Sequence, residues 1–240
     1  MNYQIIKDEK ILLDFIDWLP EITEDETYYC CLFARSKYCK GISHINTDKA
    51  QLKRFTSNRS RLFDKIRQLE CPLGSYKQKA NVVPQEALAI YINPNPRCNL
   101  KAARNGLVRL AQLVAGENHG YNMHQEMISE VQKSKSRMVY MDFDFDVSKE
   151  TLTSDMIFSD LESRGIINLE AVNLLESRGG YHMLIDIRNV AYEFKNKWYN
   201  GIKSYQQLHS TDVLNKGDNM MPVPGCTQGN FVPRFLTKAT

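Results

Sequence analysis

Apolar residues along the chain alternate between the spacing typical of helices and the spacing typical of strands. Helices are predicted where apolar residues recur every three or four positions, and strands where short apolar runs end at turn residues. The predicted helices are residues 9–19, 48–70 with a break near Ser57 and Asn58, 99–115, 154–164 and 193–208. The predicted strands are residues 28–34, 87–92, 137–145, 169–175 and 181–187. Strands and helices mix throughout, which indicates an α+β or mixed-sheet fold.

Capping residues mark several of the predicted helix ends. Pro20 closes the first helix, because proline cannot continue one. Asn99 is the expected N-cap of the helix at 99–115, and Thr153 or Ser154 that of the helix at 154–164. These signals define where the helices begin and end.

The stretch from Arg137 to Glu150, RMVYMDFDFDVSKE, places three aspartates directly after an apolar run. Asp142, Asp144 and Asp146 alternate with two phenylalanines. Successive side chains of a strand point to opposite faces, so the phenylalanines are expected in the core and the aspartates together on the other face. Carboxylates held this close repel one another, and a pair of Mg²⁺ or Mn²⁺ ions would relieve that repulsion. The alternative explanation is a solvated strand end.

Two later stretches carry polar groups suited to phosphate binding. In LLESRGGYHMLIDI, a glycine turn between two predicted strands is followed by His182. Such a turn can expose backbone N–H groups to phosphate oxygens, and Arg178 and His182 add side-chain donors, although a simple Gly-Gly hairpin is the commoner explanation. Further on, HSTDVLNKGDNMMPVPGCTQGN contains Asp212 and Lys216.

In this order, the three stretches resemble the motifs of the archaeo-eukaryotic primase superfamily, the primase-polymerase group. VYMDFD is similar to the first motif of that family, SRGGYH to the second, and TDVLNKGDNMMPVPGCT to the third. The resemblance covers about residues 137–230. The spacing, 38 residues from Asp144 to His182 and 30 from His182 to Asp212, is compact and similar to phage and plasmid members.

The resemblance implies an α+β fold with a mixed-sheet catalytic core. An RRM-like C-terminal module, residues 116–240, would pack on an N-terminal α/β module, residues 1–115. The activity implied is template-dependent nucleotidyl transfer, by which a DNA primase or primase-polymerase makes or extends primers on single-stranded DNA. A replicative helicase is the partner that the family implies.

The resemblance also assigns roles to individual residues. Two Mg²⁺ or Mn²⁺ ions would be bound by Asp142, Asp144 and Asp212. The run DFDFD also allows a shifted register, with Asp144 and Asp146 as the metal pair. The triphosphate of the incoming nucleotide would be held by Ser177, Arg178, Gly179, Gly180 and His182, with Lys216 as a further candidate.

The charge is unevenly distributed along the chain. The net charge is +3, but residues 27–115 carry 16 basic and 4 acidic side chains, whereas residues 116–240 carry 13 basic and 16 acidic ones. A basic segment next to an acidic segment is typical of a protein that binds a polyanion and catalyses a reaction close to the binding surface. Tyr38 and Tyr91 could stack on unpaired bases. The residues expected to contact template phosphates are Arg35, Lys37, Lys40, Arg97, Lys101 and Arg104.

Other functions are weaker fits to the same residues. A HAD-type phosphohydrolase also begins with a strand ending in DxD, but it leaves SRGGYH and the basic segment unexplained. A nucleic-acid-binding replication module with a degenerate site is the non-enzymatic alternative. The sequence has no apolar run long enough to span a membrane and no secretory signal, and none of its six cysteines forms a CxxC pair. A cytoplasmic protein with reduced thiols is therefore expected, with a zinc site at Cys39, Cys71 and Cys98 as the alternative.

Overall fold

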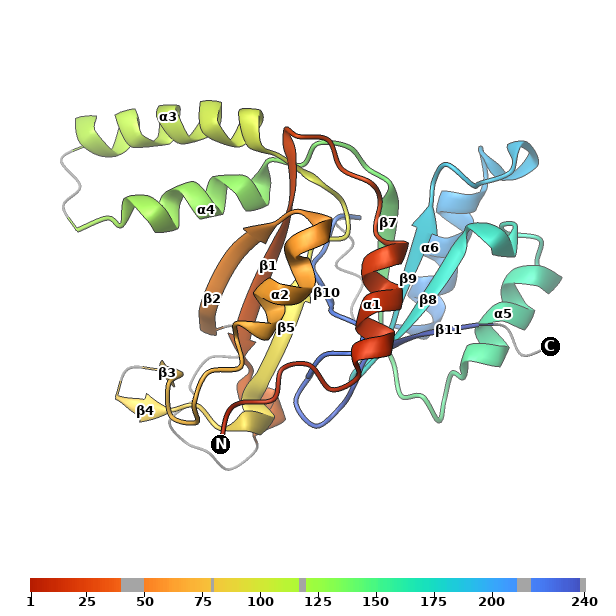
Figure 1. The fold of residues 1–240 in the computed structure, drawn as a ribbon. Helices are drawn as coiled ribbons and strands as arrows, with labels where there is room; N and C mark the ends of the chain where they lie inside the picture. Colours follow the sequence, from red (N-terminus) through yellow and green to blue (C-terminus); the bar gives the residue numbers. More distant parts are fainter. Residues whose placement is uncertain (40–49, 79, 117–119, 211–216, 238–240) are drawn as a thin grey trace.

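The computed structural model describes residues 1–39, 50–78, 80–116, 120–210 and 217–237. These residues form two larger antiparallel sheets with helices packed on them, and β3 and β4 form a separate two-stranded sheet (Figure 1). The helices are α1 (Glu9–Trp18), α2 (Leu62–Arg67), α3 (Asn99–Ala115), α4 (Met123–Lys133), α5 (Ser154–Ser163) and α6 (Trp198–His209). The strands are β1 (Glu26–Ala34), β2 (Ala50–Ser57), β3 (Lys77–Gln78), β4 (Asn81–Val82), β5 (Leu88–Ile92), β6 (Arg97–Cys98), β7 (Tyr140–Asp146), β8 (Val172–Ser177), β9 (Gly180–Asp186), β10 (Met221–Pro222) and β11 (Arg234–Leu236). The expected α+β fold is confirmed.

The first sheet has the strand order β10-β5-β1-β2, and β6 pairs with the start of β1. Strand β1 is buried along its whole length, so both of its faces are covered. On one face, Tyr28, Cys30 and Leu32 pack in a core cluster with α1 and α2. On the other face, Tyr29 and Phe33 form a smaller cluster that faces the second half of the molecule.

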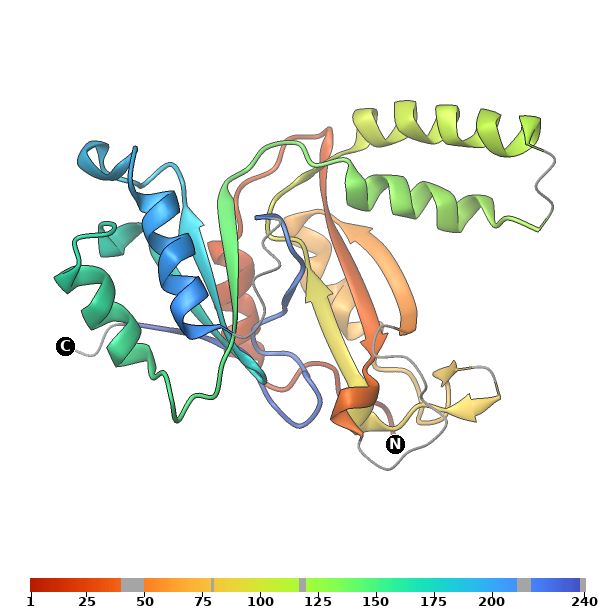
Figure 2. The ribbon, with the colours of Figure 1, turned by 180° about the vertical axis from the view of Figure 1, so that it is seen from behind.

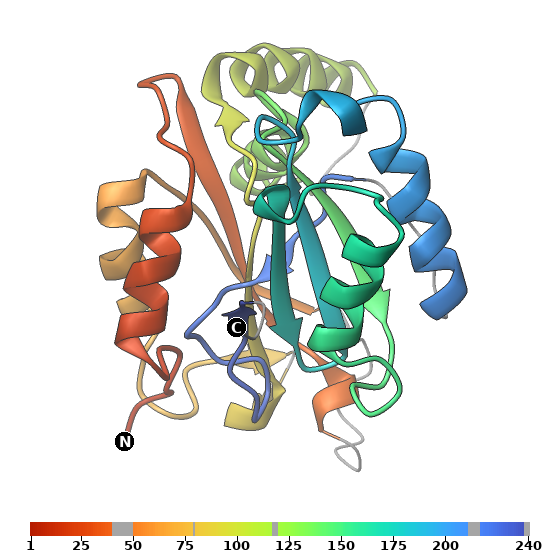
Figure 3. The ribbon, with the colours of Figure 1, turned by 90° about the vertical axis from the view of Figure 1, so that its right-hand side faces the viewer.

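The second sheet has the strand order β11-β8-β9-β7. Helices α5 and α6 cover its outer face, as Figure 3 shows, and Phe143 and Phe145 of β7 lie in the core beneath them. The order β7-α5-β8-β9-α6-β11 is that of a split βαβ arrangement. Strand β11 lies beside β8 and not beside β7, so the sheet differs from an RRM in the position of its last strand.

The predicted helix at 48–70 is wrong over its first half. Residues 50–57 form the edge strand β2, which pairs antiparallel with β1, and only residues 62–67 are α-helical. This segment is rich in basic and polar residues, so its sequence does not show the apolar-polar alternation of a strand. Its conformation is decided by pairing with the buried strand β1. Helix α4 was not predicted, and the N-cap of α3 is Cys98, whose Sγ accepts a hydrogen bond from Lys101 N, in place of the expected Asn99. The cap at Thr153 is confirmed.

Helices α3 and α4 form a hairpin that extends from the first sheet (Figures 1 and 2). Gly106 of α3 is buried, and a Cβ there would lie 2.4 Å from the side chain of Met127 on α4, so glycine permits the close approach. Arg109 pairs with Glu126 at 3.0 Å across the same contact. The boundary expected between residues 115 and 116 therefore falls inside one structural unit. In addition, β10 belongs to the first sheet, although it is far along the chain.

Arg97, expected to contact template phosphates, is instead part of the junction between the sheets. Its side chain is 2% exposed, and it donates two hydrogen bonds to the carboxylate of Asp218, at 2.9 and 3.0 Å. The nearby Asn95 accepts hydrogen bonds from the backbone N–H groups of Val139 and Tyr140 and so fixes the start of β7. A buried arginine must have such a partner, and Asp218 supplies it.

Candidate functional site

The three aspartates of β7 share one face of the second sheet, as the sequence predicts, but they differ in exposure. Asp142 is 1% exposed, whereas the side chain of Asp144 is 41% exposed and Asp146 lies at the exposed end of the strand. Phe143 and Phe145 point to the opposite face and are fully buried. The face with the aspartates is turned toward the first sheet.

His182 of β9 lies between two of these carboxylates. Strands β7 and β9 pair so that Asp144 is opposite His182. The Nδ1 atom of His182 lies 3.2 Å from both carboxylate oxygens of Asp142, and Nε2 lies 3.7 Å from Asp144 Oδ1. Burial alone would lower the pKa of His182, but Asp142 and Asp144 outweigh it and raise that pKa to about 9. His182 is therefore an imidazolium at neutral pH and donates to Asp142.

The pKa of Asp144 is also raised, first by burial and then by the neighbouring charges of Asp142 and Asp146. His182 and Lys37 oppose this shift without cancelling it. The folded protein thus holds the negative charge of Asp144 at a cost. A cation bound beside Asp144 would reduce that cost.

The glycine turn between β8 and β9 brings the second predicted motif next to the aspartates. Gly180 pairs with Asp146 and has a φ of 148°. A Cβ at Gly180 would lie 1.9 Å from the carbonyl oxygen of Phe145, so only glycine fits. Gly179 has no such constraint, because a Cβ there would meet nothing closer than Asp146 Oδ1 at 3.6 Å. Ser177 is buried at the end of β8.

Three cations from both halves of the chain gather around the ring of Tyr38. The guanidinium of Arg178 lies 4.5 Å from the ring centroid, and Arg35 and the ammonium of Lys37 lie 5.7 Å from it. A Cβ at Gly229 would lie 2.1 Å from Arg178 Nη1, so glycine leaves the room for this arginine. Nη1 of Arg178 is buried and has no hydrogen-bond partner in the described part of the chain. Such a cluster of positive charges fits an anionic ligand.

Gln228, which has no role predicted from its sequence context, connects the two halves of the site. Its Oε1 accepts from the backbone N–H of Arg178 at 2.8 Å, and its Nε2 donates to the hydroxyls of Tyr38 and Tyr91 at 3.1 and 3.2 Å. Arg35 also donates to Tyr91, at 3.1 Å. Gln228 directly follows the proline-glycine stretch of the third motif, and that location is the one available signal.

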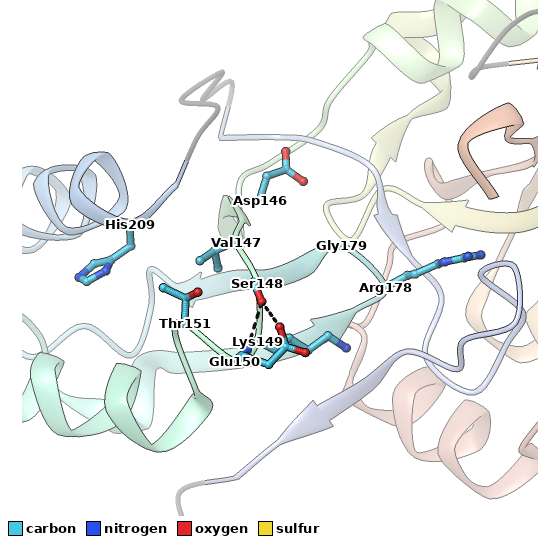
Figure 4. A pocket seen from close by; sticks show the side chains of 9 residues that line it. All are labelled: Asp146, Val147, Ser148, Lys149, Glu150, Thr151, Arg178, Gly179 and His209. Carbon is cyan, nitrogen blue, oxygen red and sulfur yellow. Dashed lines mark hydrogen bonds between the residues drawn. The ribbon is translucent and has the colours of Figure 1, made fainter. Parts of the chain in front are cut away.

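The inter-sheet cleft, about 790 Å³ in volume, is the space that these groups enclose. Its acidic wall consists of Asp144 and Asp146, with the imidazolium of His182 beside them, and its basic wall of Arg35, Lys37 and Arg178. A second hollow of about 850 Å³ lies beyond the glycine turn and shares Asp146, Arg178 and Gly179 with the cleft. Figure 4 shows this hollow, with the side chain of Arg178 directed away from His209 and toward the first sheet.

Apart from the buried Arg97, the predicted site residues fall into three groups: those around the cleft, those exposed on α3 and those outside the described residues. Asp142, Asp144, Ser177, Arg178, Gly179, Gly180 and His182 come together around the cleft. Arg35 and Lys37, expected on the template, lie in the same cleft, whereas Lys101 and Arg104 are exposed on α3. Lys40, Asp212 and Lys216 lie outside the described residues.

The two tyrosines expected to stack on bases are already engaged. Tyr91 is 8% exposed and its hydroxyl is hydrogen-bonded, and Arg178 covers the ring of Tyr38. Both tyrosine side chains contact the cations of the basic wall. Neither offers the open ring that stacking on a base requires.

The described residues contain no group of three His, Cys, Asp or Glu side chains that could hold a metal ion. The third expected ligand, Asp212, is not among them. The cysteines, including Cys39, Cys71 and Cys98, are free thiols. Within the described ranges no helix is long and apolar enough to cross a membrane.

A comparison of the chain with models of protein families, with curated proteins and with solved structures found no match.

Proposed function

We propose that this protein is a template-dependent nucleotidyltransferase, a primase-polymerase that makes or extends primers on single-stranded DNA. The observation that carries the proposal is the inter-sheet cleft, in which an acidic wall faces a basic wall. Phosphoryl transfer depends on positioning and on neutralising charge, and a cleft with these two walls offers both. The motif order of the primase superfamily supports the same reaction.

The acidic wall offers carboxylate oxygens, the ligands that Mg²⁺ and Mn²⁺ prefer. Two such ions, when bound, would activate the attacking 3′-hydroxyl and neutralise the leaving pyrophosphate. Asp144 is a ligand in either register of the run DFDFD. The near-complete burial of Asp142 and its contact with His182 favour Asp146 as the second ligand, with Asp142 holding the imidazolium in place.

The basic wall would bind the triphosphate of the incoming nucleotide. Arg178 offers a buried Nη1 that has no hydrogen-bond partner among the described residues, and Arg35 and Lys37 lie on the same aromatic ring. Guanidinium groups suit phosphate because they donate two parallel hydrogen bonds. We therefore assign Arg35 and Lys37 to binding of the nucleotide triphosphate instead of the template. Lys101 and Arg104 remain the candidates for template contacts among the described residues.

The function is tested by incubating the protein with a single-stranded DNA template, labelled nucleotides and Mn²⁺. New oligomers without a primer are the expected result, and extension of a supplied primer alone would indicate a repair-type polymerase. Phosphate release without oligomers would support a phosphohydrolase. Binding to DNA with no turnover would support a replication module with a degenerate site.

Arg178→Gln is expected to weaken nucleotide binding by about ten- to a hundredfold, the usual loss for a hydrogen bond to a charged group. Affinity for single-stranded DNA should change much less, because Arg178 lies inside the cleft. Titration with a fluorescent nucleotide in the presence of Mn²⁺ measures the first affinity, and anisotropy of labelled DNA the second. Arg234→Gln is the matched control, since Arg234 is 60% exposed and pairs with Glu176 outside the cleft. Equal loss of both affinities in Arg178→Gln would contradict the assignment.

A further inference from the structure

Helix α3 exposes apolar side chains on the face that does not contact α4. Leu107 and Val114 are each 70% exposed, and Leu100 is 50% exposed. The face toward α4 is a different one, with Ala102, Gly106 and Leu113 buried. Figures 1 and 2 show α3 on the outer side of the hairpin, with α4 between it and the first sheet. Nothing in the described part of the chain covers this exposed face.

The exposed residues follow a symmetric pattern along the helix. Leu107 is the central residue of Asn99–Ala115, and Leu100 and Val114 lie seven residues before and after it. Ala103 and Ala111 lie four residues to either side, on the same side of the helix. We call Leu100, Ala103, Leu107, Ala111 and Val114 the α3 stripe. Large and small side chains alternate along the α3 stripe, and the order is the same from either end. Apolar residues at seven-residue spacing are typical of a contact between two helices.

The charges of α3 favour one direction of pairing with a like helix. The helix contains no acidic residue, and its exposed cations, Lys101 and Arg104, both lie in the first half. A parallel copy would place Arg104 beside Arg104. An antiparallel copy separates the two Arg104 residues by ~9 Å along the axis and the two Lys101 residues by ~18 Å. Antiparallel pairing therefore avoids the like-charge contacts of a parallel one.

We propose that two copies of this chain associate through their α3 stripes, antiparallel and related by a two-fold axis at Leu107. A two-fold interface uses the same patch on both copies, so the patch must be self-complementary, as the symmetric stripe is. Leu107 then meets Leu107, and Leu100 of each copy meets Val114 of the other. The contact then joins the two α3–α4 hairpins through α3.

The size of the stripe sets the strength of this association. A helix of 17 residues is ~25 Å long, and a contact between two single helices of that length buries less than the ~1,200 Å² of a standard stable interface. The dimer is therefore weak and depends on concentration. We expect a dissociation constant on the order of 10 to 100 μM for the dimer.

Sedimentation velocity across a concentration series measures this association directly. The wild-type chain should shift from its monomer mass of 27.8 kDa toward twice that value as its concentration rises. Leu107→Glu places two like charges at the two-fold axis and should weaken the association at least ~tenfold. The matched control is Val108→Glu: Val108 is 60% exposed but lies about 100° round the helix from Leu107, so dimerisation should persist. A wild-type monomer throughout the series, or an equal effect of both variants, would overturn the proposal.

A cross-link at the axis gives a positive signature. In Leu107→Cys, each new thiol meets its own copy, so a short bismaleimide should join residue 107 to residue 107. Peptide mass spectrometry identifies the joined residues, and the wild-type chain under the same treatment reports links from its native cysteines. In Val108→Cys the link between like residues should be at least ~fivefold less abundant, because the two side chains point away from the axis. Links from residue 107 mainly to other positions would overturn the two-fold arrangement.

Discussion

Replacing Asp144 by asparagine is expected to lower primer synthesis by ~10²- to 10³-fold, the scale seen when a group that stabilises transition-state charge is removed. Asp144 is the carboxylate that both registers of the aspartate strand assign to the metal ions. The fold should survive the change. The pKa of Asp144 is raised by burial and by its acidic neighbours, so the folded state disfavours the charged form of this side chain. Asparagine has nearly the same shape without the charge, so it removes the repulsion between Asp144 and the neighbouring carboxylates.

Two measurements separate chemistry from stability in this variant. Primer synthesis is followed with labelled nucleotides and Mn²⁺, and the free energy of unfolding is measured by urea titration. Asp14→Asn is the control, since Asp14 is 70% exposed on α1, outside the cleft. Asp144→Asn with wild-type synthesis would remove the metal site from the proposal. Asp146→Asn then decides the register, because its activity is lost only if Asp146 is the second ligand.

The free energy of unfolding of the metal-free protein is expected to fall as the pH rises, because His182 is protonated in the fold well above its ordinary pKa. A pKa raised from 6.5 to about 9 corresponds to about 3 kcal/mol. This contribution is fully present below the unfolded-state value and is lost as the pH rises toward 9. Between about pH 6 and pH 8 the loss should be about 2 kcal/mol.

Urea titrations with a chelator, at several pH values in that window, measure this dependence. Below pH 8 the cysteines, whose ordinary pKa is about 8.5, contribute little to the slope. Asp142→Asn should be less stable at pH 6 and should lose most of the slope, since Asp142 is the carboxylate closest to the imidazolium. His124→Gln, on an exposed residue of α4, should keep it. An unchanged slope in Asp142→Asn would mean that Asp142 does not raise the pKa of His182.

The sequence predicts those parts of the site that depend on local pattern. Alternation along β7 separates the aspartates from the phenylalanines, and the glycine turn joins β8 and β9 in a hairpin. Both features need only the two-residue period of a strand and a hairpin of adjacent strands. For the same reason the helices at α1, α3 and α5 agree with their predicted ranges, because each has its own amphipathic pattern and a clear end.

The remaining parts depend on contacts between residues far apart in the chain. From the sequence, Arg97 is expected to be a surface cation. In the structure it is buried and paired with Asp218, which lies more than a hundred residues later in the chain. Arg35 and Lys37 read as template contacts until the fold brings Arg178 beside them. Gln228 is an ordinary polar residue in the sequence, and only the meeting of the two sheets gives it three partners.

The last strands have a consequence for synthesis on the ribosome. Residues 221–222 close the edge of the first sheet as β10, and residues 234–236 close the edge of the second as β11. Neither sheet can be completed until this late stretch of the chain has emerged. The two halves therefore cannot mature one after the other during translation, as separate domains do. Many of the pairings join residues distant in sequence, so folding should be slow and should finish only after these residues leave the exit tunnel.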